Sequence, residues 1–155
     1  MQITRETDYA IRCLLHLARE PRRVVPAAEI AAAAQVPQIF LAKILQRLAK
    51  AGLVLSHRGV RGGFRLTREP ERITLLDAVE AVQGQVALNR CAATSEHCAL
   101  EDACPAHPVW VKLSSRLARD LEKHTFKKLA QREKREGIMR KGGRTCPNTP
   151  TTKKR

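Results

Sequence analysis

Three cysteines and one histidine lie close together in the sequence and are the side chains best suited to bind a metal. Their spacing is Cys91-x6-Cys98-x5-Cys104-x2-His107. Thiolate and imidazole are soft ligands that suit zinc or an iron–sulfur cluster. The six- and five-residue intervals are longer than the about two to four residues usual between zinc-finger cysteines. A longer loop can wrap a bulkier cluster, but the spacing alone leaves iron–sulfur, zinc and a plain thiol switch open.

The remaining cysteines and the N-terminal residues bear on the compartment of the protein. No signal peptide and no long apolar stretch is visible, so we expect a cytoplasmic protein whose thiols stay reduced. An odd total of five cysteines then favours metal or redox chemistry over a disulfide framework. Cys13 falls on an apolar helical stripe and is interpreted as a core residue, and Cys146 as an exposed thiol.

The composition favours a helical protein that binds a polyanion. Hydrophobic residues make up 43% of the 155 residues but aromatic residues only 3%, which predicts an aliphatic core. The net charge is +14, and residues 111–155 hold 15 basic and 4 acidic side chains. Residues 30–68 hold seven basic side chains and no acidic one. Because an ordinary solvated surface mixes both signs, this acid-free stretch points to nucleic acid.

The order of the predicted elements matches a winged helix-turn-helix. Helices are expected over residues 4–20, 27–35 and 37–52, followed by two strands near 53–56 and 64–67 with a basic, glycine-rich loop between them. Gly52 suits a left-handed helix end. The apolar face of the third helix is predicted to consist of Phe40, Leu41, Ile44, Leu45 and Leu48.

Polar side chains of the third helix and the hairpin are the predicted DNA contacts. A helix fits the major groove, and a hairpin can follow the neighbouring backbone or minor groove. Glycine at the hairpin tip removes side-chain bulk, so the backbone can approach DNA closely. The candidate residues are Gln38, Lys43 and Arg47 on the helix and Ser56, His57, Arg58, Arg61, Gly62 and Gly63 on the hairpin.

The second half of the chain is expected to contain more helices. Thr74 and Asp77 have capping-box spacing at the start of one helix. A long amphipathic helix follows the cysteines, with Trp110, Leu113 and Leu117 near a coiled-coil spacing. We therefore divide the chain into a DNA-binding region (residues 1–83), a cysteine-rich loop (84–107), a dimerisation helix with the segment after it (108–135) and a disordered basic tail (136–155).

Several motifs together resemble the IscR, NsrR and RirA group of bacterial winged-helix regulators. They are "TDYAIRCLLHLA", "LAKILQRLAKAGLVLSHRGVRGGFRL", "ITLLDAVEAV" and the three cysteines, in that order. The resemblance covers roughly residues 1–135. It implies a mainly α winged helix-turn-helix fold with a long C-terminal dimerisation helix (108–124), a homodimer, operator DNA as partner, and an iron–sulfur cluster held by Cys91, Cys98 and Cys104.

The resemblance implies two candidates for the fourth cluster ligand. His107, followed by "PVW", resembles the IscR type and favours a 2Fe–2S cluster. Asp8 in "TDYAIR" resembles the NsrR type, in which this acid reaches the 4Fe–4S cluster of the other subunit. Ala42 stands where IscR-like proteins carry a glutamate that discriminates sequences, so a different operator is expected.

We therefore expect a DNA-binding transcription regulator that senses cluster status, iron, nitric oxide or redox stress. It is expected not to be an enzyme and to have no small-molecule substrate, because no phosphate loop, paired carboxylates or nucleophile–base arrangement is recognisable. No membrane partner is expected, because no apolar stretch approaches the length that spans a bilayer. One alternative is a zinc-stapled or thiol-switched regulator of the same fold. An alternative of another class is an iron–sulfur assembly or electron-transfer partner that docks through its basic tail.

Overall fold

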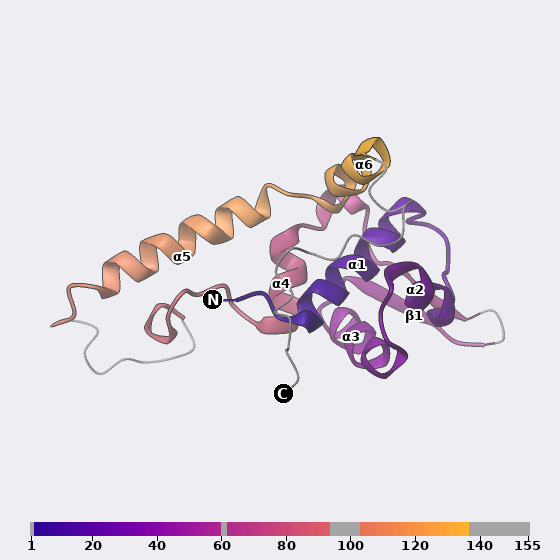
Figure 1. Cartoon of the computed structure of the whole chain (residues 1–155), viewed down its shortest axis with the longest axis horizontal. Coiled ribbons are helices and arrows are strands. Elements are labelled where there is room, and N and C mark those ends of the chain that lie inside the picture. The colour runs from indigo at the N-terminus through magenta and orange to yellow at the C-terminus, as the bar shows by residue number, and fades with distance from the viewer. Residues whose placement is uncertain (1, 60–61, 94–102, 137–155) are drawn as a thin grey trace, which may run out of the picture.

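The computed structural model describes residues 2–59, 62–93 and 103–136, and Cys98, Arg61 and Cys146 lie outside these ranges. Within them the fold consists of helices and one two-stranded hairpin (Figure 1). The mainly helical prediction is therefore confirmed.

The first three helices form the helix-turn-helix part of the fold. Helix α1 is Arg5–Arg19, α2 is Ala27–Ala34 and α3 is Gln38–Lys50. Thr4 caps α1 by accepting a hydrogen bond from the Thr7 amide. Gln35 ends α2 in the left-handed conformation with φ of 52°, and the chain bends by 110° between α2 and α3. This bend lets both helices bury an apolar side in one core while α3 keeps an outer side free.

The hairpin follows α3 directly. Strands β1 (Val54–His57) and β2 (Gly63–Leu66) pair antiparallel, with Val54 opposite Leu66 and His57 opposite Gly63. Gly52 has a φ of +69° just before β1, as expected for the residue after a helix end. The hairpin also pairs along the free edge of β2, where Phe64 exchanges two backbone hydrogen bonds of 2.9 Å with Val25. This bridge fixes the hairpin to the segment between α1 and α2.

The remaining elements in the described part of the chain are two short 3-10 turns and three helices. They are η1 (Pro70–Arg72), α4 (Leu75–Gln83), η2 (Arg90–Ala92), α5 (His107–Glu122) and α6 (Phe126–Glu136). Both hydrogen bonds of the predicted capping box, between Thr74 and Asp77, are present at the start of α4. Helix α6 turns back onto the domain, because the Phe126 amide donates to the Ile73 carbonyl and the Leu75 amide to the His124 carbonyl.

The core is aliphatic, as the composition predicts. Its fully buried side chains come from α1, α2, α3, β2 and α4 and from the connecting residues Val25, Leu53 and Ile73. Phe126 of α6 is the buried aromatic among them, with 0% exposure. One prediction is wrong: Phe40 is 40% exposed instead of lying on the buried face of α3. The first turn of α3 projects beyond the core, and the Phe40 ring packs against the partly buried Tyr9 ring, with centroids 5.9 Å apart.

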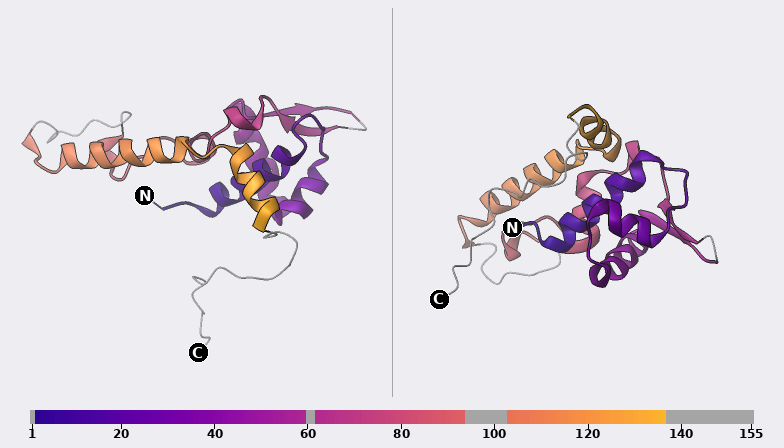
Figure 2. Two further views of the ribbon diagram at one scale, coloured as in Figure 1. Left: turned by 90° about the horizontal axis from the view of Figure 1, so that it is seen from above. Right: turned by 45° about the vertical axis from the view of Figure 1, so that its right-hand side comes forward.

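Helix α5 extends away from the rest of the domain (Figures 1 and 2). Its neighbours are α4 and the η2 turn. As a result, four large apolar side chains of its first half stay exposed by 36–52%, namely Val109, Trp110, Val111 and Leu113. Among the described residues, no single helix is both long and apolar enough to cross a bilayer.

Candidate functional site

The outer side of α3 carries the first group of predicted contact residues. Gln38 lies at the start of the helix, directly after the N-cap Pro37, and is exposed. The Lys43 side chain is 56% exposed and the Arg47 side chain 35%. Gln38 and Lys43 are thus accessible on α3, and Arg47 is partly accessible.

Lys43 and Arg47 both interact with one acid that the sequence analysis did not single out. The Glu6 carboxylate accepts a hydrogen bond of 2.9 Å from Lys43 Nζ and one of 2.6 Å from Arg47 Nη1. The hydrogen bond from Lys43 is the main cause that lowers the pKa of Glu6 below its usual range. Arg47 Nη1 also donates to the Val82 carbonyl at 3.1 Å. Arg47 therefore ties α3 to α1 and to the end of α4, in addition to any contact outside the domain.

The hairpin brings together the second group of predicted contacts. Ser56 and Arg58 are exposed, and His57 Nε2 lies 2.9 Å from Arg65 Nε, which donates to it. Gly59 has a φ of +109°, a conformation that side chains disfavour. Arg61 lies outside the described residues.

Gly62 and Gly63 both lie at positions where a side chain would collide with the backbone. A Cβ on Gly63 would lie 2.3 Å from the Val25 carbonyl oxygen, and one on Gly62 would lie 2.5 Å from the His57 carbonyl oxygen. Gly63 is also buried. The expectation that these glycines serve a close approach of the hairpin to DNA therefore needs revision for Gly63, because the close approach there is to the segment between α1 and α2.

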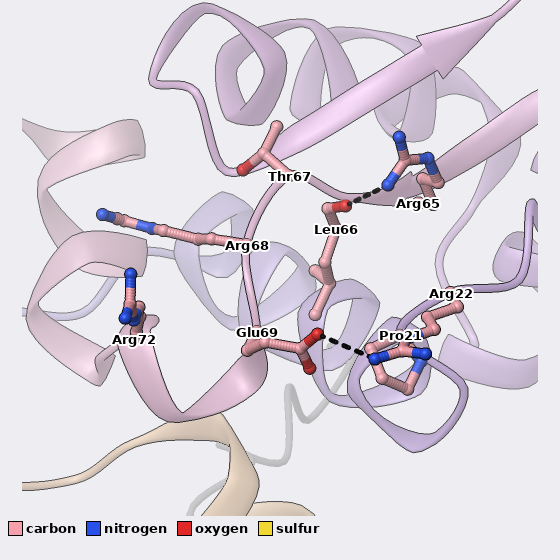
Figure 3. A pocket seen from close by; sticks show the side chains of 8 residues that line it. All are labelled: Pro21, Arg22, Arg65, Leu66, Thr67, Arg68, Glu69 and Arg72. Atoms are coloured by element: carbon pink, nitrogen blue, oxygen red, sulfur yellow. Dashed lines mark hydrogen bonds and ion pairs between the residues drawn. The ribbon is translucent and has the colours of Figure 1, made fainter.

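A basic hollow of ≈ 390 Å³ lies at the base of the hairpin (Figure 3). Its lining includes the four arginines Arg22, Arg65, Arg68 and Arg72. Arg22 pairs with Glu69 at 3.8 Å, Arg68 pairs with Asp77 at 3.3 Å, and Arg65 donates to His57. Since three of the four guanidinium groups already have partners inside the domain, we interpret the hollow as a junction between the hairpin and its neighbours.

The first part of the cysteine-rich loop, at Leu88 and Cys91, is hydrogen bonded to α5 at two points. His107, the first residue of α5, has its Nε2 atom 2.9 Å from the Cys91 carbonyl oxygen. Ser114 is buried, accepts a hydrogen bond of 3.0 Å from the Leu88 amide and donates to the Trp110 carbonyl. Cys91 and Cys104 are half-buried free thiols. The structure thus brings His107 to the Cys91 end of the segment.

These ligand candidates do not form a complete metal centre within the part of the chain that is described. No group of three or more His, Cys, Asp or Glu side chains there is arranged to hold a metal ion. Cys98 belongs to the residues outside that part. A shared metal centre therefore requires Cys98 to lie close to Cys91, Cys104 and His107.

Asp8, the other candidate ligand, lies on α1. Its carboxylate pairs with Arg12 at 2.6 Å, one turn along the helix, and its side chain is 49% exposed. Nearby, Gln83 at the end of α4 accepts hydrogen bonds from the Thr4 amide and the Thr7 hydroxyl. The start of α1 is therefore held against the end of α4, from which the cysteine segment departs.

The comparison with known families assigns this architecture. Residues 3–132 match the Rrf2 family, which is described as an iron-dependent transcriptional regulator. The chain belongs to the Rrf2 family. This Rrf2-family chain is 41% identical over 105 residues to "Protein aau3" of Rhizobium meliloti (strain 1021), covering 67% of this chain and 68% of that protein. It is 31% identical over 135 residues to the transcriptional regulator NsrR of Shouchella clausii (strain KSM-K16), covering 86% of this chain and 91% of that protein.

Solved structures of related regulators have the same fold as this Rrf2-family chain. CymR (YrzC), the global cysteine regulator of B. subtilis, superposes with a TM-score of 0.69 at 25% identity, covering 85% of this chain and 98% of that one. IscR of T. potens gives a TM-score of 0.67 at 23% identity, covering 88% of this chain and 91% of that one. The winged-helix prediction and the expected family are thereby confirmed, and the chain is a DNA-binding transcription regulator and not an enzyme.

Sequence reasoning missed the residues that connect the parts of the site. An acidic residue in the first turn of α1 is a recognisable sequence feature, and Glu6 has this position. Nothing near Glu6 in the sequence, however, indicates a contact with Lys43, 37 residues away. Ser114 also had a weak signal, as a small polar residue on the apolar side of a helix. Its hydrogen bond to the Trp110 carbonyl lies within α5, but the one from the Leu88 amide forms only when the segment after α4 folds against α5.

Proposed function

We propose that the protein is a homodimeric transcription regulator whose binding to operator DNA responds to an iron–sulfur cluster. The cluster would be held by Cys91, Cys98 and Cys104, with His107 as the fourth ligand. The observation that carries this proposal is the contact between His107 and the Cys91 carbonyl, because it brings the imidazole to the cysteine segment. When bound, the cluster would supply a centre that iron supply, nitric oxide or oxidants can change.

The chemistry of the donors fits such a cluster. Cys91 and Cys104 are half-buried and free, so their thiols are available and partly shielded from water. The matched family is described as iron-dependent, which also supports iron over zinc. A 2Fe–2S cluster follows if His107 is the ligand. Asp8 is the weaker candidate within one subunit, because its carboxylate already pairs with Arg12, and its use would favour a 4Fe–4S cluster reached from the partner subunit.

The DNA surface would combine α3 with the end of the hairpin. Gln38 and Lys43 are exposed on α3, and Ser56, His57 and Arg58 lie at the hairpin end, so these groups can face one duplex. Arg61 and Gly62 belong to the same proposed surface. We assign Arg47 mainly to the positioning of α3, because its guanidinium is hydrogen bonded to Glu6 and Val82, and Gly63 to packing against Val25.

The dimer would form through α5. Val109, Trp110, Val111 and Leu113 expose an apolar surface that a second copy of the helix can bury. The cysteine segment is anchored on the same helix through Ser114 and His107. A change at the cluster would therefore act on the helix that sets the distance between the two DNA-binding domains.

The second candidate is a regulator of the same fold that binds zinc or switches through its thiols. The likeness to CymR, a cysteine regulator, supports it. The idea of an iron–sulfur assembly or electron-transfer partner has no such support, since the family and the relatives are transcriptional regulators.

Anaerobic purification followed by visible absorption spectroscopy and iron and sulfide analysis separates these candidates. A cluster protein absorbs in the visible range and contains iron and sulfide, whereas a zinc protein is colourless. We expect Cys91→Ala and His107→Ala to lower the iron and sulfide content. His124→Ala, which replaces a histidine two residues beyond the end of α5, should leave it unchanged. Zinc without iron in anaerobically isolated protein would contradict the cluster proposal. It would not contradict the proposal that the protein binds DNA.

A further inference from the structure

Ile39 is the most exposed large apolar side chain described in this protein. It is 82% exposed. The other large aliphatic side chains of α3 behave differently: Leu41, Ile44, Leu45 and Leu48 are at most 5% exposed. Ile39 therefore contributes nothing to the core, and as a β-branched residue it also has only a modest helix propensity. A polar residue would suit this position better if the surface faced only water.

The surroundings of Ile39 indicate what could cover it. It is the second residue of α3 and is flanked by the exposed Gln38, Ala42 and Lys43. Ala42 lies one turn further along the same side and leaves space beside the isoleucine. Residues 30–68 contain no acidic residue, and the Glu6 carboxylate that reaches this surface from α1 already pairs with Lys43 and Arg47. A polyanion therefore suits this surface better than a basic protein partner. Helix α5, which carries the proposed dimer contact, extends away from α3 (Figure 1).

We propose that Ile39 selects thymine by packing against its 5-methyl group in the major groove. The proposal rests on the proposed placement of α3 in that groove. The N-terminal residues of a recognition helix contact base edges, and the thymine methyl is the apolar group that a base pair displays in the major groove. Gln38, the neighbouring residue, has the amide that pairs with adenine. The first turn of α3 thus selects for A·T pairs in each half-site.

The experiment removes the methyl group without changing any hydrogen-bonding atom of the base. A duplex is first selected from a randomised pool with the anaerobically isolated protein. Each thymine of that duplex is then replaced singly by deoxyuridine, and the Kd is measured by fluorescence anisotropy at one salt concentration. At one position in each half-site, we expect deoxyuridine to weaken binding about fourfold, which corresponds to about 0.8 kcal/mol for one buried methyl group.

Two variants connect the effect to Ile39. Ile39→Ala should bind thymine and deoxyuridine duplexes equally at that position, and it should fold normally because the side chain is exposed and alanine favours helices. Ile3→Ala, which removes an exposed isoleucine outside α3, should keep the fourfold difference. Equal binding of every deoxyuridine duplex by the unaltered protein, or a difference that persists in Ile39→Ala, overturns the proposal. If the pool yields no enriched duplex, sequence-selective DNA binding itself fails, and this proposal with it.

Discussion

Replacing Glu6 by glutamine should strengthen the dependence of DNA binding on salt. The Glu6 carboxylate lies 2.9 Å from Lys43 Nζ and 2.6 Å from Arg47 Nη1. Because the hydrogen bond from Lys43 lowers the pKa of Glu6, this carboxylate is ionised at neutral pH. It therefore places a negative charge on the surface of α3. It also pairs with the Lys43 ammonium group, which would otherwise be available to a phosphate. Glutamine keeps the shape of the side chain and removes the charge.

The size of the effect follows from the release of counterions. If the released Lys43 gains one phosphate contact per subunit, the slope of log K against log salt becomes steeper by about 0.9 per subunit, or about 1.8 per dimer. Between about 50 and 200 mM salt, this adds about a twelvefold loss of affinity to the loss shown by the unaltered protein. At the lowest salt concentration, the variant should bind more tightly.

Fluorescence anisotropy on a duplex of arbitrary sequence, repeated at several salt concentrations, measures this slope. Glu71→Gln is the matched control, because Glu71 also pairs with a lysine, Lys127, but does so between η1 and α6. Its slope should equal that of the unaltered protein. An unchanged slope in Glu6→Gln would refute the reasoning about Lys43, and an equal change in both variants would show that only net charge matters.

Three further predictions concern the core, the thiols and the dimer. Phe126→Ala should lower the free energy of unfolding by about 3–5 kcal/mol in urea titrations, because the ring is completely buried; a loss below about 1 kcal/mol would mean that α6 does not complete the core. Burial raises the pKa of the Cys13 thiol to about 12, so iodoacetamide at neutral pH should modify Cys91 but not Cys13 in the folded apo-protein, and mass spectrometry that finds equal modification would argue against this burial. A double change of Trp110→Asp and Leu113→Asp should convert the dimer to monomers by light scattering, whereas a mass that stays at two chains would exclude the apolar face of α5 as the interface.

Much of the helical part of the fold could be predicted because its signals are local. Thr4 and the Thr74–Asp77 pair cap helices through atoms at most three residues away. Gly52 marks the end of α3, and the alternation on both sides of the loop predicts the hairpin. The cysteine spacing likewise points to soft-metal chemistry, since the identity and spacing of the ligands are properties of the sequence. In each case the residues that determine the structure are close neighbours in the chain.

Contacts between distant segments could not be predicted in this way. The position of Phe126 in the core, the bridge between Val25 and Phe64 and the close approach at Gly63 all depend on how complete elements pack. The exposure of Phe40 and Ile39 is a further case, because helical periodicity places a residue on a side of the helix but does not indicate where the core ends.

The sequence by itself determined the kinds of side chains available for DNA and metal binding, the helices and the hairpin that carry them, and the resemblance to a family of regulators. Only the tertiary structure decided that the Glu6 carboxylate accepts hydrogen bonds from Lys43 and Arg47, two of the predicted DNA-contacting residues. It also decided that the His107 imidazole contacts the Cys91 carbonyl. The physical reason is that hydrogen bonds and ion pairs require distances of about 3 Å, and residues so far apart in the chain reach such distances only through the packing of the helices between them.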